Sequence, residues 1–378
     1  MVIPADWKMI RLADIGSAAI GLTYSPSAVA DGGTLVLRSS NIQNEQLVFH
    51  DDVFVKMDVP LSSRVQPGDI LVCARNGSRP LIGKSVLLDH RVEGMAFGAF
   101  MALFRSKFNN YVIHQFRSNG MRRQIEMHLG ATINQITNSS LLSFEIPFPS
   151  LAKERDAIAE ALSDADAAIE SLDALIAKKR DVKQAAMQQL LTGRTRLPGF
   201  TAEWKEVRFD EVFARVNISN RKLQTSEYSD IGRLPVMDQG QTRIAGFTDR
   251  QDIELIPPRD GFVIFGDHTR IVKHVRRPFV AGADGVQILR SCEGFNAEFL
   301  SLLLSSSRIP NTGYNRHFKF LKELIFKVPS DLVEQEAIAE ALSVMGDELE
   351  ALTEQVSKLR MVKEGMMQDL LTGKVRLV

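Results

Sequence analysis

The sequence predicts an α+β protein with two globular heads, each built on a twisted, mainly antiparallel sheet, separated by two long helices that pair as an antiparallel coiled coil. Three observations support this. Residues 157–197 recur at residues 337–377 with an offset of 180 residues, no gap and 21 identities in 41 positions. Each copy carries a narrow apolar stripe, and each follows a segment of short β-like runs. A repeat of this length indicates two copies of a domain-sized unit.

The repeat also fixes the expected domain boundaries. The heads open alike, with the pattern Trp-Lys-x-apolar-Arg-apolar beginning at Trp7 and at Trp204. Beyond these openings the two heads have little in common, which is expected if each recognises something different. We expect head 1 over residues 1–149, a long spacer helix over 150–197, head 2 over 198–330 and a second long spacer helix over 331–378.

The apolar residues of both long helices follow alternating steps of four and three residues, the pattern of a coiled-coil seam. The expected seam consists of Ile158, Leu162, Ile169, Leu172, Ile176, Ile338, Leu342, Leu349, Leu352, Val356 and Leu359. Lys363 interrupts the second stripe. About 35 helical residues give a rod of roughly 50 Å. The equal length and register of the stripes favour pairing within one chain, and the alternative is pairing of each copy with another chain.

The ends of both helices carry start and stop signals. Glu154 and Glu334 lie in the first turns, where the helix dipole favours a carboxylate. Each copy ends in Leu-Leu-Thr-Gly, which places Gly193 and Gly373 as C-terminal caps.

Within the heads, short β-like runs alternate with turn residues instead of with regular helices, which argues against a doubly wound sheet. The expected strands are 34–38, 53–55, 69–74, 85–88 and 99–104 in head 1 and 262–265, 279–280 and 286–289 in head 2. We also expect helices over 111–128 and 297–305.

Composition places the chain among globular cytoplasmic proteins. It is 44% hydrophobic with a formal net charge of zero, and no run approaches the length of a membrane-spanning helix. The N-terminal residues lack the apolar run of a signal peptide. Cys73 and Cys292 are expected to be buried free thiols. The heads together carry a charge of +5 and the helical segments −5, which suits heads that face phosphate and helices that face protein.

Motifs for catalysis are absent from the sequence. Residues 77–85 resemble a phosphate-binding loop, but five residues separate Gly77 from Gly83 where four are needed, and Pro80 removes a backbone donor. No Asn/Asp-Pro-Pro-aromatic tetrad of amino-methyltransferases occurs, and the histidines and cysteines lack metal-ligand spacing. We therefore expect no catalytic residue and no metal site.

Several motifs in a fixed order identify a resemblance. Both helices end in Leu-Leu-Thr-Gly-(Arg/Lys)-x-Arg-Leu, and Val328-Pro329 leads into Glu334-Gln335 at the start of the second helix. Residues 234–249 and 68–84 also resemble stretches of the same family. The resemblance covers essentially the whole chain. The sequence is similar to the DNA-specificity (S) subunits of type I restriction–modification systems.

This resemblance implies a non-catalytic subunit whose two heads are target-recognition domains. Each head would read one half of a bipartite, asymmetric double-stranded DNA target. The helices would set the gap and bind adenine methyltransferase subunits, two of them, and through them restriction/translocase subunits. S-adenosylmethionine and ATP with Mg²⁺ would be bound by those partners. A rod of roughly 50 Å corresponds to about 15 base pairs.

The candidate DNA-binding residues of head 1 are loop-borne cations, amides and hydroxyls, the groups that contact guanine, adenine and phosphate. They are Arg75, Asn76, Ser78, Arg79, Lys84, Thr132, Asn134 and Gln135. Asn76-Gly77 could instead form a type I′ hairpin turn, and residues 130–135 a polar connector.

The candidates of head 2 are of the same kinds. They are Gln239, Gln241, His268, Thr269, Arg270, Lys273, Tyr314, Asn315, Arg316, His317 and Lys319. Residues 238–241 could instead be a structural turn, and residues 314–319 a basic surface turn anchored by Phe318. Two other classes compete: a self-standing methyltransferase with a duplicated recognition domain, which the missing tetrad disfavours, and a coiled-coil interaction scaffold without a DNA role.

Overall fold

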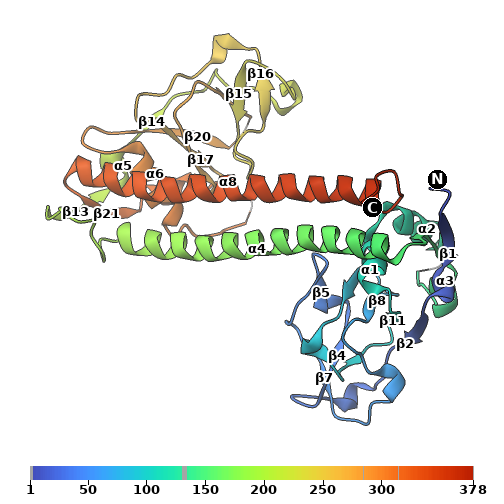
Figure 1. Ribbon diagram of the computed structural model, residues 1–378. Helices are drawn as coiled ribbons and strands as arrows, with labels where there is room; N and C mark the ends of the chain where they lie inside the picture. The colour runs from blue at the N-terminus through green and yellow to red at the C-terminus, as the bar shows by residue number, and fades with distance from the viewer. Residues whose placement is uncertain (1–2, 130–133, 284, 314, 378) are drawn as a thin grey trace. The chain divides into compact units, whose positions relative to one another are not determined.

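The computed structural model describes residues 3–129, 134–283, 285–313 and 315–377. The chain divides into two compact units, unit 1 (residues 1–172 and 355–378) and unit 2 (residues 173–354). The long helices α4 (Ala152–Leu190) and α8 (Leu332–Leu370) each contribute to both units. Each unit is therefore one head together with part of each helix (Figure 1).

The described residues of head 1 form short strands and α-helices. Its strands are β1 (Trp7–Arg11), β2 (Ser17–Ile20), β3 (Val29–Ala30), β4 (Thr34–Leu37), β5 (Ile42–Gln43), β6 (Gln46–Leu47), β7 (Phe54–Val55), β8 (Ile70–Cys73), β9 (Ser85–Leu87), β10 (Ala96–Phe97), β11 (Met101–Arg105) and β12 (Glu145–Pro149). Its helices are α1 (Asn109–Arg117), α2 (Asn119–Leu129) and α3 (Asn138–Ser143).

Head 2 is built in the same way. Its strands are β13 (Trp204–Arg208), β14 (Phe213–Val216), β15 (Leu234–Met237), β16 (Gly246–Thr248), β17 (Phe262–Gly266), β18 (Val272–Val275), β19 (Val280–Ala281), β20 (Val286–Ser291) and β21 (Ile325–Pro329). Its helices are α5 (Phe209–Val212), α6 (Ala297–Ser306) and α7 (Phe318–Leu321).

The two heads share a topology that their sequences do not reveal. The central sheet has the order β2-β11-β8-β9 in head 1 and β14-β20-β17-β18 in head 2, antiparallel throughout. A second sheet, β10-β4-β7-β3 or β16-β15-β19, contains one parallel pair. In each head the first strand also pairs antiparallel with the last, β1 with β12 and β13 with β21. These pairings confirm the predicted α+β class with mainly antiparallel sheets.

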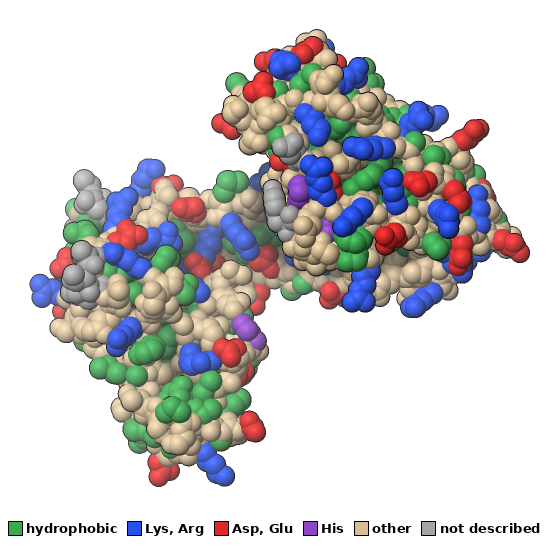
Figure 2. All heavy atoms as spheres, turned by 180° about the vertical axis from the view of Figure 1, so that it is seen from behind, with side chains coloured by type: hydrophobic (Ala, Val, Ile, Leu, Met, Phe, Trp, Pro, Cys, Tyr) green, Lys and Arg blue, Asp and Glu red, His purple; other side chains and the backbone are tan. Residues whose placement is uncertain are grey.

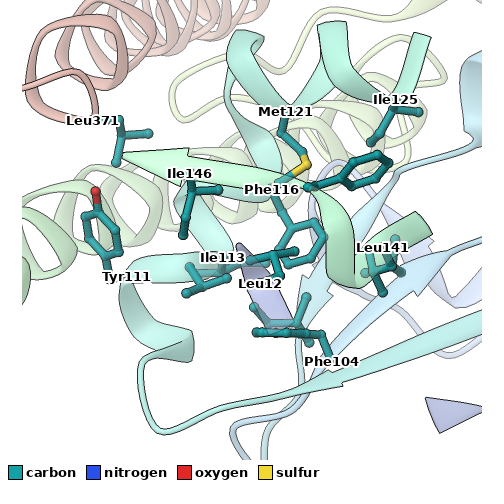
Figure 3. Close-up of a cluster of buried hydrophobic side chains, with 14 of the residues drawn as sticks. Leu12, Phe104, Tyr111, Ile113, Phe116, Met121, Ile125, Leu141, Ile146 and Leu371 are labelled. Carbon is teal, nitrogen blue, oxygen red and sulfur yellow. The ribbon is translucent and has the colours of Figure 1, made fainter. Parts of the chain in front are cut away.

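The largest core of unit 1 joins the head to both long helices. Helices α1 and α2 pack Tyr111, Phe116 and Met121 against the central sheet, and Ile158 and Leu371 complete the cluster from α4 and from the turn after α8. Figure 3 shows Leu371 beside Tyr111 and Ile146, on the opposite side of the cluster from Leu141. Unit 2 repeats this arrangement with its own aromatic cluster and the buried Leu191, Ile338 and Leu342.

The long helices run antiparallel, side by side in Figure 1. In unit 1 the start of α4 lies against the end of α8, and in unit 2 Lys179 of α4 pairs with Glu348 of α8 at 2.6 Å. The predicted seam residues are buried or half-buried along both helices. The coiled-coil prediction is therefore confirmed, because the stripe of each helix meets the other within the same chain.

Lys363 explains the interruption of the second stripe. Its ammonium pairs with Asp166 of α4 at 2.5 Å and with Glu45 of head 1 at 2.8 Å. Arg117 joins the same two carboxylates, at 2.9 Å from Asp166 and 3.5 Å from Glu45. Glu45 lies in the tight turn between β5 and β6, with φ of 66°. This seam lysine is thus neutralised by a hairpin of the head.

Paired contacts close each unit at the helix ends. The Glu154 carboxylate accepts hydrogen bonds from the Trp7 indole at 3.1 Å and from Arg376, which follows α8. In unit 2, Glu334 accepts from Trp204 at 3.4 Å and from Arg196 at 2.5 and 2.6 Å. Both carboxylates are fully buried. The motifs shared by both copies are therefore the residues that join each head to the helix ends.

The predicted capping glycines are confirmed. Gly193 and Gly373 have φ of 69° and 72°, the left-handed region in which a side chain is strained. A Cβ at Gly193 would also crowd the Trp204 ring, at 3.1 Å from its nearest atom.

Some local predictions are wrong. The helix expected over 111–128 is two helices, because Ser118 is extended, ends α1 and accepts the Met121 N–H with its hydroxyl at 3.2 Å. The strand expected over 99–104 begins at Met101 and leaves Phe100 exposed.

Cys73 is a buried free thiol, and its burial raises the pKa of the thiol, whereas Cys292 is free but only half-buried. Within the described parts of the chain, no helix has the length and apolar character to cross a membrane.

Candidate nucleic-acid interface

In head 1 the two candidate segments lie side by side although about 60 residues separate them. Arg75 and Gln135 form an antiparallel bridge, and the Ile136 N–H donates to the Ala74 carbonyl at 2.7 Å. Arg75, Asn134 and Gln135 are exposed. The loop that follows β8 and the segment that precedes α3 therefore form one edge of head 1.

The Arg75–Arg79 loop is held in place by its own side chains. Asn76 donates to the Ser39 hydroxyl at 3.2 Å and accepts the Ser78 N–H at 2.9 Å. Neither Asn76 nor Gly77 has a positive φ, so the alternative of a type I′ turn is wrong. Ser78 and Arg79 are exposed. This leaves cationic and hydroxyl groups on an ordered loop.

The other two head 1 candidates have different settings. Lys84 is half-buried and donates to the Ile42 carbonyl at 3.1 Å, so its ammonium supports the β5–β6 hairpin. Thr132 lies outside the described residues.

In head 2 three candidate segments meet at the end of β17. Asp267 is buried, its carbonyl accepts the His317 N–H at 2.8 Å and its carboxylate accepts the Phe318 N–H at 2.7 Å. The Gln239 side chain accepts the His268 N–H at 3.1 Å, and the Gln239 backbone carbonyl accepts the Thr269 hydroxyl at 2.6 Å. Residues 238–242, 267–270 and 315–319 therefore make up one surface.

Four head 2 candidates hold this surface together instead of projecting from it. His317 is fully buried, and its Nδ1 lies 2.8 Å from the Asp267 carbonyl. Lys273 donates to the Asp238 and Thr242 carbonyls at 2.8 and 2.7 Å, and burial lowers its pKa. Gln239 is half-buried, and Arg270 donates to the Ile309 carbonyl at 3.1 Å.

Five of the remaining head 2 candidates are exposed. Gln241, Thr269, Arg316 and Lys319 are exposed, as is Asn315, whose amide donates to the Thr312 carbonyl. His268 is half-buried, and Tyr314 lies outside the described residues. Phe318 packs against the core of unit 2 with its ring centroid 5.9 Å from that of Phe209. It anchors the loop, as the alternative for this segment held, while Asn315 and Arg316 stay exposed.

One residue at the head 1 edge has no counterpart in the sequence prediction. Phe100 is 60% exposed, and the Arg75 guanidinium lies over its ring, 5.2 Å from the centroid. Sequence reasoning missed it because Ala99-Phe100 read as the start of a strand. An exposed aromatic side chain next to a candidate base-reading arginine is a signal that only the structure supplies.

Charge and metal content complete the description of the interface. Figure 2 shows Lys and Arg side chains spread over the visible face of both heads, with Asp and Glu among them. Among the described residues, no group of three or more His, Cys, Asp or Glu side chains could hold a metal ion.

Comparison with known proteins agrees with this organisation. Residues 4–178 match the family described as type I restriction modification DNA specificity domain. The chain is 27% identical over 271 residues to the type I restriction enzyme EcoKI specificity subunit of Escherichia coli K12, which covers 67% of this chain and 57% of that protein. It is 30% identical over 198 residues to the StySPI specificity subunit of Salmonella potsdam, covering 50% and 42%. The chain thus spans about half the length of these two relatives.

The fold has a close solved counterpart. The crystal structure of the type I restriction–modification S subunit from M. genitalium superposes with a TM-score of 0.70 at 16% identity, covering 98% of this chain and 96% of that one. The duplicated helices, the equivalent central sheets of the two heads and the sequence matches agree. This chain is therefore similar to type I restriction–modification DNA specificity subunits, and residues 4–178 carry the match to the specificity-domain family.

Proposed function

We propose that this chain is the non-catalytic subunit that reads a bipartite, asymmetric DNA target, one half with each head. The observation that carries the proposal is the convergence in each head of segments distant in sequence, which bear cationic, amide and hydroxyl groups on one edge. Arg and Lys suit guanine and phosphate, and Asn and Gln suit adenine. The match of residues 4–178 to the type I restriction modification DNA specificity domain supports the same interpretation.

Within each edge the residues divide into two roles. We assign contact with DNA to the exposed side chains, Arg75, Ser78, Arg79, Asn134 and Gln135 in head 1 and Gln241, Thr269, Asn315, Arg316 and Lys319 in head 2. His317, Lys273 and Gln239 act as positioning residues, because their polar atoms already bind the loops that carry the others.

The helix pair suits a spacer between half-sites. Each helix has 39 residues, which gives roughly 58 Å at 1.5 Å per residue, or about 17 base pairs of duplex. The Lys363 cluster and the buried Glu154 and Glu334 fix the helices to the heads, so the gap would be set by folded structure.

The outer surfaces of the helices would bind the catalytic partners. Exposed apolar side chains on α4 and α8 include Val182, Val344, Met361 and Val362, each more than 45% exposed. Two adenine methyltransferase subunits would dock there, and restriction/translocase subunits through them, in the cytoplasm. S-adenosylmethionine and ATP with Mg²⁺ would bind to those partners and not to this chain.

The test is selection of randomised duplexes by the full chain with its methyltransferase partner, followed by Arg75→Ala and Arg316→Ala. Selection of a split motif is expected, with information lost in one half only for each variant and in opposite halves for the two. Equal loss in both halves would overturn the assignment of heads to half-sites. Failure of the wild type to select any motif would favour an interaction scaffold without a DNA role.

A further inference from the structure

Phe100 and Arg75 form a stacked pair at the edge of head 1. The Phe100 ring is 60% exposed, yet its backbone is fixed, since its carbonyl accepts the N–H groups of Ala74 and Arg75 at 3.0 and 2.9 Å. The Arg75 guanidinium lies 5.2 Å from the ring centroid. Both side chains therefore extend from the ends of the central strands β8 and β11, which makes their relative position well defined.

The pair lies beside other polar residues of the same edge. The backbone of Arg75 forms a β-bridge with Gln135, and the neighbouring Asn76 side chain donates to the Ser39 hydroxyl. An isolated exposed apolar side chain needs no explanation. An exposed aromatic ring that is covered on one face by an arginine, and surrounded by base-reading residue types, suggests a composite contact with both an apolar and a polar component.

The chemistry of the major groove matches such a pair. Arginine binds the O6 and N7 atoms of guanine, and apolar side chains, phenylalanine among them, contact the 5-methyl group of thymine. Successive bases of one strand are about 3.4 Å apart along the helix axis. The separation of 5.2 Å between guanidinium and ring therefore allows the two side chains to address neighbouring bases. A wedge between base pairs would need both faces of the ring, and Arg75 covers one of them.

We propose that Arg75 and Phe100 read one dinucleotide step of the head 1 half-site. Arg75 binds a guanine, and Phe100 contacts the 5-methyl group of the thymine next to it. This inference rests on the proposed function, because it names the bases that one edge of head 1 would recognise.

The experiment replaces each thymine of the selected duplex with deoxyuridine, which lacks only the methyl group. The full chain with its methyltransferase partner is titrated against each duplex. For the wild type, one position in one half-site should lose affinity about four-fold, the equivalent of ~0.8 kcal/mol for one buried methyl-sized group. With Phe100→Ala, thymine and deoxyuridine at that position should bind equally, and the position should lose its preference in a repeated selection.

Two further variants make the test specific. Phe49 is 42% exposed beneath Arg91, whose guanidinium lies 5.5 Å from its ring centroid, so it is a stacked pair of the same kind elsewhere in head 1. Phe49→Ala should keep the full deoxyuridine effect. Phe100→Leu should keep most of it, because leucine retains an apolar contact.

The possible failures are distinguishable. If Phe100→Ala, with an unchanged circular dichroism spectrum and melting temperature, keeps the four-fold effect of deoxyuridine, the inference is overturned. The same holds if no thymine of the selected motif is sensitive to loss of its methyl group. If the wild type selects no split motif, the proposed function fails instead.

Discussion

Replacing Glu154 with glutamine should weaken unit 1 and leave unit 2 intact, and Glu334→Gln should do the reverse. Each carboxylate is fully buried at the start of a long helix and accepts hydrogen bonds from a tryptophan indole and an arginine. Glutamine keeps the shape, but it removes the charge and turns one acceptor into a donor that faces the guanidinium.

The size of the effect follows from the contacts. A hydrogen bond to a charged group contributes about 1.5–3 kcal/mol, and a buried donor left without a partner costs a similar amount. One of the two arginine contacts survives with the amide oxygen, so we expect a loss of about 3 kcal/mol in the free energy of unfolding of the affected unit. For a unit of this size the melting temperature should fall by roughly 6–12 °C.

Hydrogen exchange followed by mass spectrometry can assign the effect to a unit, alongside calorimetry of the full chain. Glu154→Gln should accelerate exchange at the start of α4 and in residues 371–377, and Glu334→Gln at the start of α8 and in residues 191–203. Glu160→Gln and Glu340→Gln are matched controls, because these exposed glutamates occupy equivalent positions one turn or more along the same helices. A change below about 0.5 kcal/mol in either buried variant, or loosening of both units by one of them, would refute the reasoning.

Three other predictions concern buried polar groups. Burial, together with Arg117 and Lys363, lowers the pKa of His114 to about 3. In the unfolded chain this histidine binds a proton at about pH 6.5, so the free energy of unfolding should fall below that pH by about 1.4 kcal/mol per pH unit. In urea unfolding, His114→Gln should lose about 2 kcal/mol less than the wild type between pH 7 and pH 5. Lys363→Met should cost about 1–2 kcal/mol, since the carboxylates that lose a partner are partly exposed, whereas Lys183→Met at the equivalent position should stay within about 0.5 kcal/mol in the same assay. His317→Leu should broaden sequence selection in the half-site of head 2 alone, and unchanged selection would show that this histidine does not position the loop.

The long helices were the most predictable part of the fold. Their 3.5-residue stripe, first-turn carboxylates and terminal glycines depend on local geometry, and local geometry is what a single sequence expresses. The heads were less predictable, because strands of two to six residues pair across long separations. Ser118 shows the same limit on a smaller scale, since its neighbours continue a helical pattern that one hydroxyl cap divides.

The candidate interface was predictable in residue type and not in arrangement. Loop-borne arginines and amides marked candidate segments, but only tertiary pairing brings Arg75 to Gln135 and His317 to Asp267. The structure also distinguishes candidates with exposed side chains from candidates whose side chains hold the loops in place. In the sequence, His317 and Lys273 are candidates for contact with DNA. In the structure, the His317 Nδ1 and the Lys273 ammonium are hydrogen-bonded to backbone carbonyls of the loops.

Position 363 and its equivalent, position 183, show how the duplication has diverged with its surroundings. In unit 1, Lys363 faces Asp166 and Glu45. The residue equivalent to Asp166 is Gly346, and the Lys183 ammonium lies so close to it that a Cβ there would be 2.8 Å away. In unit 1 the head therefore supplies a second carboxylate for the lysine, whereas in unit 2 the lysine lies against a glycine. By contrast, the Glu, Arg, Trp and Gly residues that close each unit occur in both copies, because each head must end on the same helix pair. The loops at the edges of the heads take no part in that closure, which leaves them free to differ.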